Sequence, residues 1–172
     1  MSTRGILGAS LLGFTLSFGC AGEEAGPAAP PPPSAVPVDY SFGTVDGELI
    51  GSNVLRGRVT VLLFITTFDL ASQAQAKRLE DLHRQHAPRI NAVGVVLEAA
   101  RYVDLARAFR DITKIHYPLA MASESTLAGV GPFGGVNTVP TWVVLDRRSA
   151  VHSVFRGPLE PEELEKLVVA AE

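Results

Sequence analysis

Blocks of continuous hydrophobic residues alternate along the chain with stretches of helical spacing. Residues 59–65, VTVLLFI, are apolar at nearly every position, which is typical of a central strand that is covered on both faces. Residues 90–97 repeat this pattern, and a stretch with helical periodicity follows each run. The order β-α-β-α predicts an α/β domain with a partly parallel sheet.

Two helices are predicted between and after these strands. The first extends from Leu70 to about His86 and is stopped by Pro88, because proline cannot continue a helix. The second begins near Tyr102. The apolar positions that we expect to pack against the sheet are Ala71, Ala74, Leu79 and Leu82 in the first helix and Leu105, Phe109 and Ile112 in the second.

Turn signals mark both ends of the domain. Asp46-Gly47 separates residues 40–42 from residues 48–50, and such a dipeptide predicts an N-terminal hairpin. Residues 141–145 and 151–155 are joined by a short polar segment, which predicts a second antiparallel pair. A last helix begins near Pro161, since proline is favoured at a first helical position.

The first 37 residues have a different composition. Residues 6–18 form an apolar run after Arg4, and this run of about thirteen residues is shorter than the roughly 20 that span a bilayer. We therefore expect residues 1–20 to be a secretory signal. Residues 21–37 are rich in proline and alanine and are predicted to be a linker. The folded domain then comprises residues 38–172.

Cys20 ends the signal in the segment Ser17-Phe18-Gly19-Cys20. This segment resembles the lipobox of bacterial lipoproteins, in which a small residue precedes a cysteine that is acylated. Ser17 departs from the pattern, because leucine is usual at that position. The resemblance implies lipidation at Cys20, with a simple secretory cut nearby or an uncut anchor as the alternatives. With Ala21 following, the sorting pattern of such lipoproteins favours the outer membrane.

Charge and cysteine content exclude several functions. The chain has 15 basic and 18 acidic residues and no basic block that could neutralise a row of phosphates, so nucleic acid is not expected as a partner. Cys20 is the single cysteine. No intramolecular disulfide and no cysteine-based metal cluster can therefore form.

Two segments carry a family resemblance. Residues 64–75, FITTFDLASQAQ, align with the F-W-A-x-W-C-x-x-C-x-x-E segment of membrane-anchored thiol-disulfide reductases of the TlpA/ResA type. Residues 136–146, VNTVPTWVVLD, are similar to the V-x-x-x-P-T-x-x-x-x-D segment of the same family. The resemblance implies a thioredoxin-like fold with a central mixed sheet of about five strands flanked by helices. It also implies that Pro140 follows a cis peptide bond.

Both redox cysteines of that family are replaced here. Asp69 stands at the attacking position and Ser72 at the resolving position, and neither can perform thiolate chemistry. We expect Asp69 to cap the first helix by accepting from the N–H of Ala71 or Ser72. In the family a groove beside the cis proline receives an extended peptide, and here it would be lined by Phe68, Asp69, Phe133, Val139 and Pro140.

No other motif predicts chemistry. His83 and His86 are half of a metal site at best, and His116 and His152 have no visible partner. Ser72 lacks the surroundings of a hydrolase nucleophile. The glycine-rich loop at residues 129–135 lacks the lysine of a phosphate-binding loop. We predict neither a metal nor a cofactor.

Two functions follow as hypotheses. The first is a non-catalytic module of the bacterial cell envelope that binds an extended peptide or an envelope protein and is held at the membrane by its lipid. The second is a thioredoxin-family oxidoreductase or antioxidant protein that works with thiols supplied by a partner. A cis proline with a purely structural role explains Pro140 as well as a binding groove does.

Overall fold

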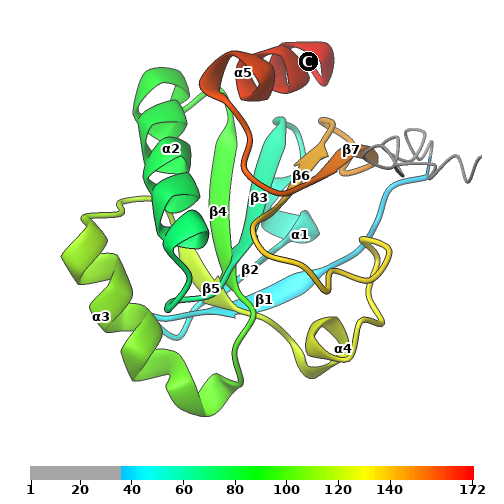
Figure 1. Cartoon of the computed structure of the whole chain (residues 1–172). Helices are drawn as coiled ribbons and strands as arrows, with labels where there is room; N and C mark the ends of the chain where they lie inside the picture. Colours follow the sequence, from blue (N-terminus) through cyan, green and yellow to red (C-terminus); the bar gives the residue numbers. More distant parts are fainter. Residues whose placement is uncertain (1–35) are drawn as a thin grey trace, which may run out of the picture.

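A computed structural model describes residues 36–172. The predictions for the signal, for lipidation at Cys20 and for most of the linker lie outside these residues. The described part forms one mixed sheet with helices on both faces (Figure 1). It therefore has the α/β architecture that the hydrophobic pattern predicts.

Seven strands form this sheet in the order β2-β1-β5-β4-β3-β6-β7. Their bounds are β1 Ser41–Thr44, β2 Leu49–Gly51, β3 Thr60–Ile65, β4 Asn91–Val96, β5 Leu119–Met121, β6 Thr141–Leu145 and β7 Val151–Arg156. The pairs β3-β4 and β4-β5 are parallel, and the other neighbouring pairs are antiparallel. Strands β3 to β7 form the central mixed sheet of about five strands that the resemblance implies, and the N-terminal hairpin β1-β2 adds the other two. Strand β5 was missed because its three residues are too few to show a period.

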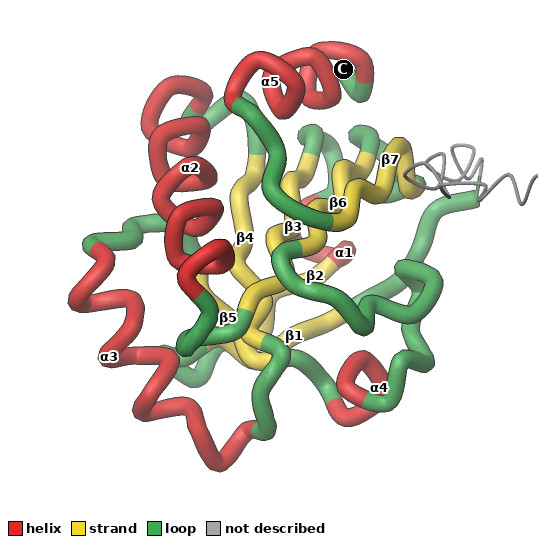
Figure 2. Tube along the Cα trace, viewed as in Figure 1, coloured by secondary structure: helices red, strands yellow, loops and turns green. Residues whose placement is uncertain are grey.

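The predicted N-terminal hairpin is confirmed. Strands β1 and β2 pair in antiparallel fashion, with Phe42 opposite Ile50, and Gly47 at the turn has a φ of 88°. A positive φ is easily adopted only by glycine. Through β1 and β5 the hairpin joins the main sheet (Figure 2).

Five α-helices accompany the described strands. They are α1 Ser52–Leu55, α2 Leu70–His86, α3 Val103–Thr113, α4 Glu124–Leu127 and α5 Pro161–Ala170, with a short 3-10 turn η1 at Ala100–Tyr102. The bounds of α2 are those predicted from the sequence. Helices α2, α3 and α5 cover one face of the sheet, where Leu79, Phe109 and Leu164 belong to one core cluster.

The other face has a separate core that is rich in aromatic rings. Tyr40, Phe42, Phe64 and Phe133 lie with ring centroids 5.3 to 6.4 Å apart. Side chains on β3 alternate between the two cores, since Leu63 belongs to the helical face and Phe64 to the aromatic face. The buried residues of both clusters that the structure describes fall within 40–171.

Packing of the helices differs from the expectation at several positions. In α2, Leu79 and Leu82 are buried as predicted, but Ala74 is exposed. Two polar residues of this helix, Gln75 and Glu80, are buried instead. The oxygen of Gln75 accepts the N–H of Leu159 at 3.1 Å, which satisfies a polar group that hydropathy alone would place in solvent.

Candidate functional site

Helix α2 begins where the chain leaves β3 at the edge of the sheet. Asp69 has extended backbone angles, and its Oδ2 accepts the backbone N–H of Ser72 at 2.7 Å. The predicted N-cap is thereby confirmed. Three hydrogen bonds hold the pKa of the Asp69 carboxyl below its usual value. The Ser72 hydroxyl contributes most, and the N–H groups of Ser72 and Ala71 add to it.

Ser72, which stands where the related reductases have their resolving cysteine, is fully buried. Its hydroxyl oxygen accepts the backbone N–H of Thr66 at 3.3 Å, which ties the end of β3 to the first turn of α2. A serine enclosed in this way has no access to a substrate carbonyl. Asp69 and Ser72 therefore act here as structural hydrogen-bonding groups of the helix start.

A buried carboxylate fixes the loop that precedes Asp69. Glu98, just after β4, accepts both the N–H and the hydroxyl of Thr67 at 2.7 Å through one oxygen. The carbonyl of Thr67 in turn accepts the amide of Gln73 at 3.3 Å. No motif in the sequence indicated Glu98, because its role depends on the parallel pairing that brings the ends of β3 and β4 together.

The same loop presents two large apolar side chains to solvent. Phe68 is 76% exposed and Leu70 is 80% exposed. The structure thus places Phe68 on the surface beside the capping Asp69, where a ligand can reach it. Exposed side chains of this size at a rigid helix start are a feature of interaction surfaces.

The proline loop enters β6 next to the helix start. The peptide bond between Val139 and Pro140 is cis, as predicted. The carbonyl of Pro140 accepts the N–H of Gly157 at 2.8 Å. Val139 is half-buried, and its backbone N–H and C=O make no hydrogen bond to any residue in the described range 36–172.

A hollow of about 320 Å³ lies between the ends of β3 and β4 and the proline loop. Its lining consists of Thr66, Leu97, Leu127, Val136, Asn137 and Val139. Thr66 follows β3 and Leu97 follows β4, so strand ends meet the proline loop there. The Thr66 hydroxyl is buried and has no hydrogen-bond partner in the described part of the chain. The structure therefore brings the end of β3 and the residue before the cis proline to one apolar depression.

Phe133 does not belong to the surface of this site. It is 4% exposed and packs against Tyr40, Phe42 and Phe64 in the aromatic core. The expectation that it lines the groove is corrected, because the glycine-rich loop turns its ring inward. Phe68, Asp69 and Val139 keep accessible groups, whereas Pro140 is buried.

The histidines differ from what the sequence suggested. The backbone N–H of His116 donates to one oxygen of Glu80 at 2.8 Å, and its Nδ1 lies 2.8 Å from the other. His116 therefore has a partner that was not visible in the sequence. Burial of Glu80 opposes ionisation, but the hydrogen bonds from His116 outweigh it and lower the pKa of this carboxyl.

His83 and His86 each contact another side chain of the domain. Both are half-buried, with His83 edge-on to Tyr117 at 6.3 Å and His86 Nε2 at 3.0 Å from Glu165. Among residues 36–172 there is no group of three or more histidine, cysteine or acidic side chains that is placed to hold a metal ion.

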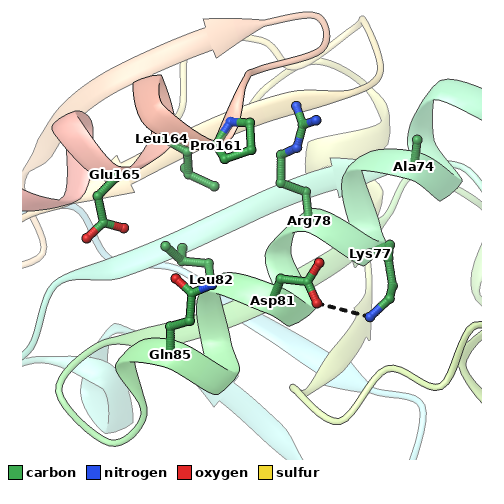
Figure 3. Close-up of a pocket in the computed structure, with 9 residues that line it drawn as sticks. All are labelled: Ala74, Lys77, Arg78, Asp81, Leu82, Gln85, Pro161, Leu164 and Glu165. Atoms are coloured by element: carbon green, nitrogen blue, oxygen red, sulfur yellow. Dashed lines mark hydrogen bonds and ion pairs between the residues drawn. The ribbon is translucent and has the colours of Figure 1, made fainter.

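A second hollow of about 380 Å³ lies between α2 and α5 (Figure 3). Its lining mixes charges of both signs, including Lys77, which pairs with Asp81 at 3.0 Å. Arg78 donates to the carbonyl of Leu159 and pairs with Glu160 at 3.3 Å. These charged groups already have partners, and none of them lies at the start of α2 or in the proline loop.

No helix within the described residues combines the length and the hydrophobicity that a membrane span requires.

Comparison with known proteins agrees with the fold. No protein-family model matches the chain. The chain is 24% identical over 129 residues to the thioredoxin-like protein YneN of Bacillus subtilis, and the matched region covers 74% of each sequence.

Solved structures extend the comparison. A DsbF homologue from Corynebacterium diphtheriae has a TM-score of 0.69 and 19% identity, with 78% of this chain and 86% of that chain covered. A secreted thiol-disulfide isomerase from Corynebacterium glutamicum has a TM-score of 0.67 and 18% identity, with 77% and 83% covered. The chain is therefore a protein of thioredoxin-like fold that resembles thiol-disulfide oxidoreductases and lacks both of their paired cysteines.

Proposed function

We propose that this protein is an exported module that binds extended polypeptide segments without redox chemistry. The observation that carries the proposal is the unpaired backbone of Val139 beside an apolar hollow. A strand that pairs with one exposed backbone edge gains affinity from main-chain hydrogen bonds, and adjacent pockets then select its side chains. The ligand is an extended segment of a peptide or of an envelope protein.

The state of the helix start supports a role without catalysis. Thiol-disulfide exchange requires a thiolate, and the two positions hold Asp69 and a fully buried Ser72. Their hydrogen bonds preserve the helix start next to the hollow. The ligand surface thus persists in the absence of the thiols.

Export and lipid attachment are proposed from the sequence of residues 1–20. The apolar run and Cys20 support this part of the proposal, and the similar isomerase from Corynebacterium glutamicum is described as secreted. Labelled palmitate should be incorporated by the wild type and not by a Cys20→Ala variant. Incorporation that persists in the variant, or recovery of the wild type outside the membrane fraction, would contradict the anchor.

Binding is tested with a thiol-free probe. The chain beginning at Ala21 retains all described contacts, and we would measure its affinity for an unfolded protein whose cysteines have been reduced and carboxymethylated. Leu127→Asp combined with Val139→Asp should weaken binding at least tenfold, because both carboxylates enter the apolar hollow. Val130→Asp is the matched control, since Val130 is 70% exposed and does not line the hollow.

Two results would contradict the proposal. One is the absence of binding to the thiol-blocked probe. The other is equal binding by the hollow variant and by Val130→Asp. A disulfide-reduction assay with and without envelope extract separates the proposal from an oxidoreductase that borrows thiols, because only the latter gains activity from the extract.

A further inference from the structure

The hollow beside Val139 contains a polar group that the fold leaves unused. Thr66 lines this hollow and is 8% exposed. Its hydroxyl oxygen is buried and makes no hydrogen bond to any residue in the range 36–172. Buried polar groups in folded proteins are normally hydrogen-bonded, because an unmade bond lowers stability. A hydroxyl that is kept at this position in spite of that cost points to a ligand group that completes it.

The adjacent threonine shows the contrast. Thr67 donates its hydroxyl to Glu98 at 2.7 Å and is satisfied inside the domain. Residues 64–69 align with the F-W-A-x-W-C segment of the similar reductases, which has alanine at the position of Thr66. This part of the fold can therefore be built without a hydroxyl, and the Thr66 hydroxyl needs another explanation.

The Thr66 hydroxyl can reach a ligand without any movement of the backbone. The hydroxyl and the methyl group of threonine branch from the same Cβ, and a rotation about χ1 between staggered positions exchanges them. The hollow has a volume of about 320 Å³, which is about ten times the ~30 Å³ that a water molecule occupies in the liquid. A side chain as long as glutamine therefore fits.

A second polar group borders the same hollow. Asn137 lines it and is exposed. The Oδ1 atom of Asn137 accepts the hydroxyl of Thr138 at 3.2 Å, so its NH₂ group remains available to a ligand. Among residues 36–172, the other side chains that line the hollow are apolar and uncharged: Leu97, Leu127, Val136 and Val139.

We infer that the hollow selects the neutral amide side chain of glutamine or asparagine on the extended segment that pairs with Val139. This inference rests on the proposed function and adds a specificity to it. The ligand amide oxygen would accept from the NH₂ group of Asn137, and the ligand NH₂ group would donate to the Thr66 hydroxyl. A charged side chain would enter an apolar hollow without a counter-charge, and an aliphatic one would leave the Thr66 hydroxyl unpaired.

The experiment compares three blocked peptides in which alanine alternates with one test residue. The test residue is glutamine, methionine or glutamate, which have side chains of similar length. Affinity for the chain beginning at Ala21 is measured by calorimetric titration. The glutamine peptide should bind about fivefold more tightly than the methionine peptide, because only glutamine completes the hydrogen bond. It should bind at least tenfold more tightly than the glutamate peptide.

Thr66→Val replaces the hydroxyl with a methyl group of similar shape. This variant should lose the preference for glutamine over methionine and still bind the methionine peptide. It should unfold at the same urea concentration as the wild type or at a higher one, because no hydrogen bond of the domain is removed. Thr113→Val is the matched control and should keep the preference, since Thr113 lies in α3 and does not line this hollow.

A preference for glutamine that Thr66→Val abolishes and Thr113→Val retains supports the inference. Equal affinity for the glutamine and methionine peptides, a preference that survives in Thr66→Val, or a clear loss of stability in that variant would overturn it. The thiol-blocked unfolded protein judges the proposed function separately. If this probe still binds through Leu127 and Val139, only the amide specificity fails; if neither the probe nor any peptide binds, both fail.

Discussion

The start of α2 and the loop before β6 lie at the same edge of the sheet, but they differ in how far their polar groups are hydrogen-bonded within the domain. At the helix start, the Asp69 carboxylate accepts from Ser72, and Ser72 accepts from Thr66. In the proline loop, the backbone of Val139 makes no hydrogen bond within residues 36–172. One segment is closed on itself and the other remains open to a ligand.

This difference separates chemistry from recognition. Catalysis in a thioredoxin-like fold would depend on the side chains at positions 69 and 72, whereas strand pairing depends on the backbone of another segment. Substitution of both cysteines can therefore remove the first property and preserve the second. This separation can be tested by substitutions at the helix start, in the body of α2 and in the exposed loop.

The largest effect is expected from Asp69→Cys combined with Ser72→Cys. Position 69 caps α2 and position 72 lies in its first turn, which is the arrangement of a Cys-x-x-Cys pair. A disulfide should form, and the thiol at position 69 should titrate below the free value of about 8.5. Mass spectrometry detects the disulfide bridge. The pH dependence of the reaction with iodoacetamide gives the thiol pKa, and the insulin turbidity assay measures turnover.

This double variant separates several explanations. A bridge without turnover would mean that the groove has diverged from that of the reductases. A missing bridge, or a thiol pKa at or above the free value, would contradict the placement of these residues at the helix start. Asp69→Cys alone is the control and should form no intramolecular bridge.

Glu80→Ala should have the next largest effect, because α2 is held at its middle by a buried carboxylate. Removal leaves the N–H of His116 without its acceptor and empties a buried site, at a cost of about 2 kcal/mol in the free energy of unfolding. Urea denaturation measures it. Exposed Asp81→Ala on the same helix is the control and should stay within about 0.5 kcal/mol.

The pH dependence of this interaction has a definite sign. The folded pKa of Glu80 lies below its ordinary value of 4.5, so its contribution is present above that value and is lost as pH falls through the folded pKa. The difference in stability between wild type and Glu80→Ala should therefore shrink in acid below about pH 4.5. A difference that grows in acid would contradict the assignment.

Asp69→Ala should have a smaller effect, about 1 kcal/mol, because one helix cap is lost. Asp69→Asn, which retains a capping oxygen, should recover most of it. Thermal unfolding at neutral pH measures both variants. Equal destabilisation by alanine and asparagine would indicate that charge at the helix start, and not the hydrogen bond to Ser72, is what stabilises α2.

Phe68→Ser should leave stability within about 0.5 kcal/mol of the wild type, since the ring is 76% exposed. Its effect should instead appear in binding of the thiol-blocked unfolded protein, which should weaken severalfold. Leu49→Ser, an equally exposed site on β2, is the matched control. A large loss of stability would show that Phe68 packs against the loop and is not a contact residue.

The sequence was sufficient for the parts of the fold that have strong local signals. Local residues are enough to predict three features: the buried strand β3 from its apolar run, the two ends of α2 from Asp69 and Pro88, and the hairpin turn from Asp46-Gly47. The cis bond at Pro140 came from a family resemblance over a short segment. These features depend on residues that are close together in the chain.

The errors concern contacts between distant segments. The buried Glu80 accepts from the exposed His116, which is 36 positions away in the chain, and the buried Glu98 accepts from Thr67 across 31 positions. Hydropathy assigns such residues to solvent, because their burial depends on partners that only the fold supplies. Ile112 was expected in the core for the converse reason, since helical spacing shows amphipathicity but not how wide a face the sheet can cover.

The entry of the chain into the domain determines how the whole molecule is presented. Val38 donates its N–H to the carbonyl of Ser149 at 2.9 Å, and Pro37 forms a bridge to Ala150 in the turn after β6. The groove lies at the opposite end of this strand, about 16 Å away at roughly 3.3 Å per residue. If the protein is held at a surface through the residues that precede Val38, the proposed groove lies at the far end of β6 from that attachment. A polypeptide bound there would not have to displace the attachment.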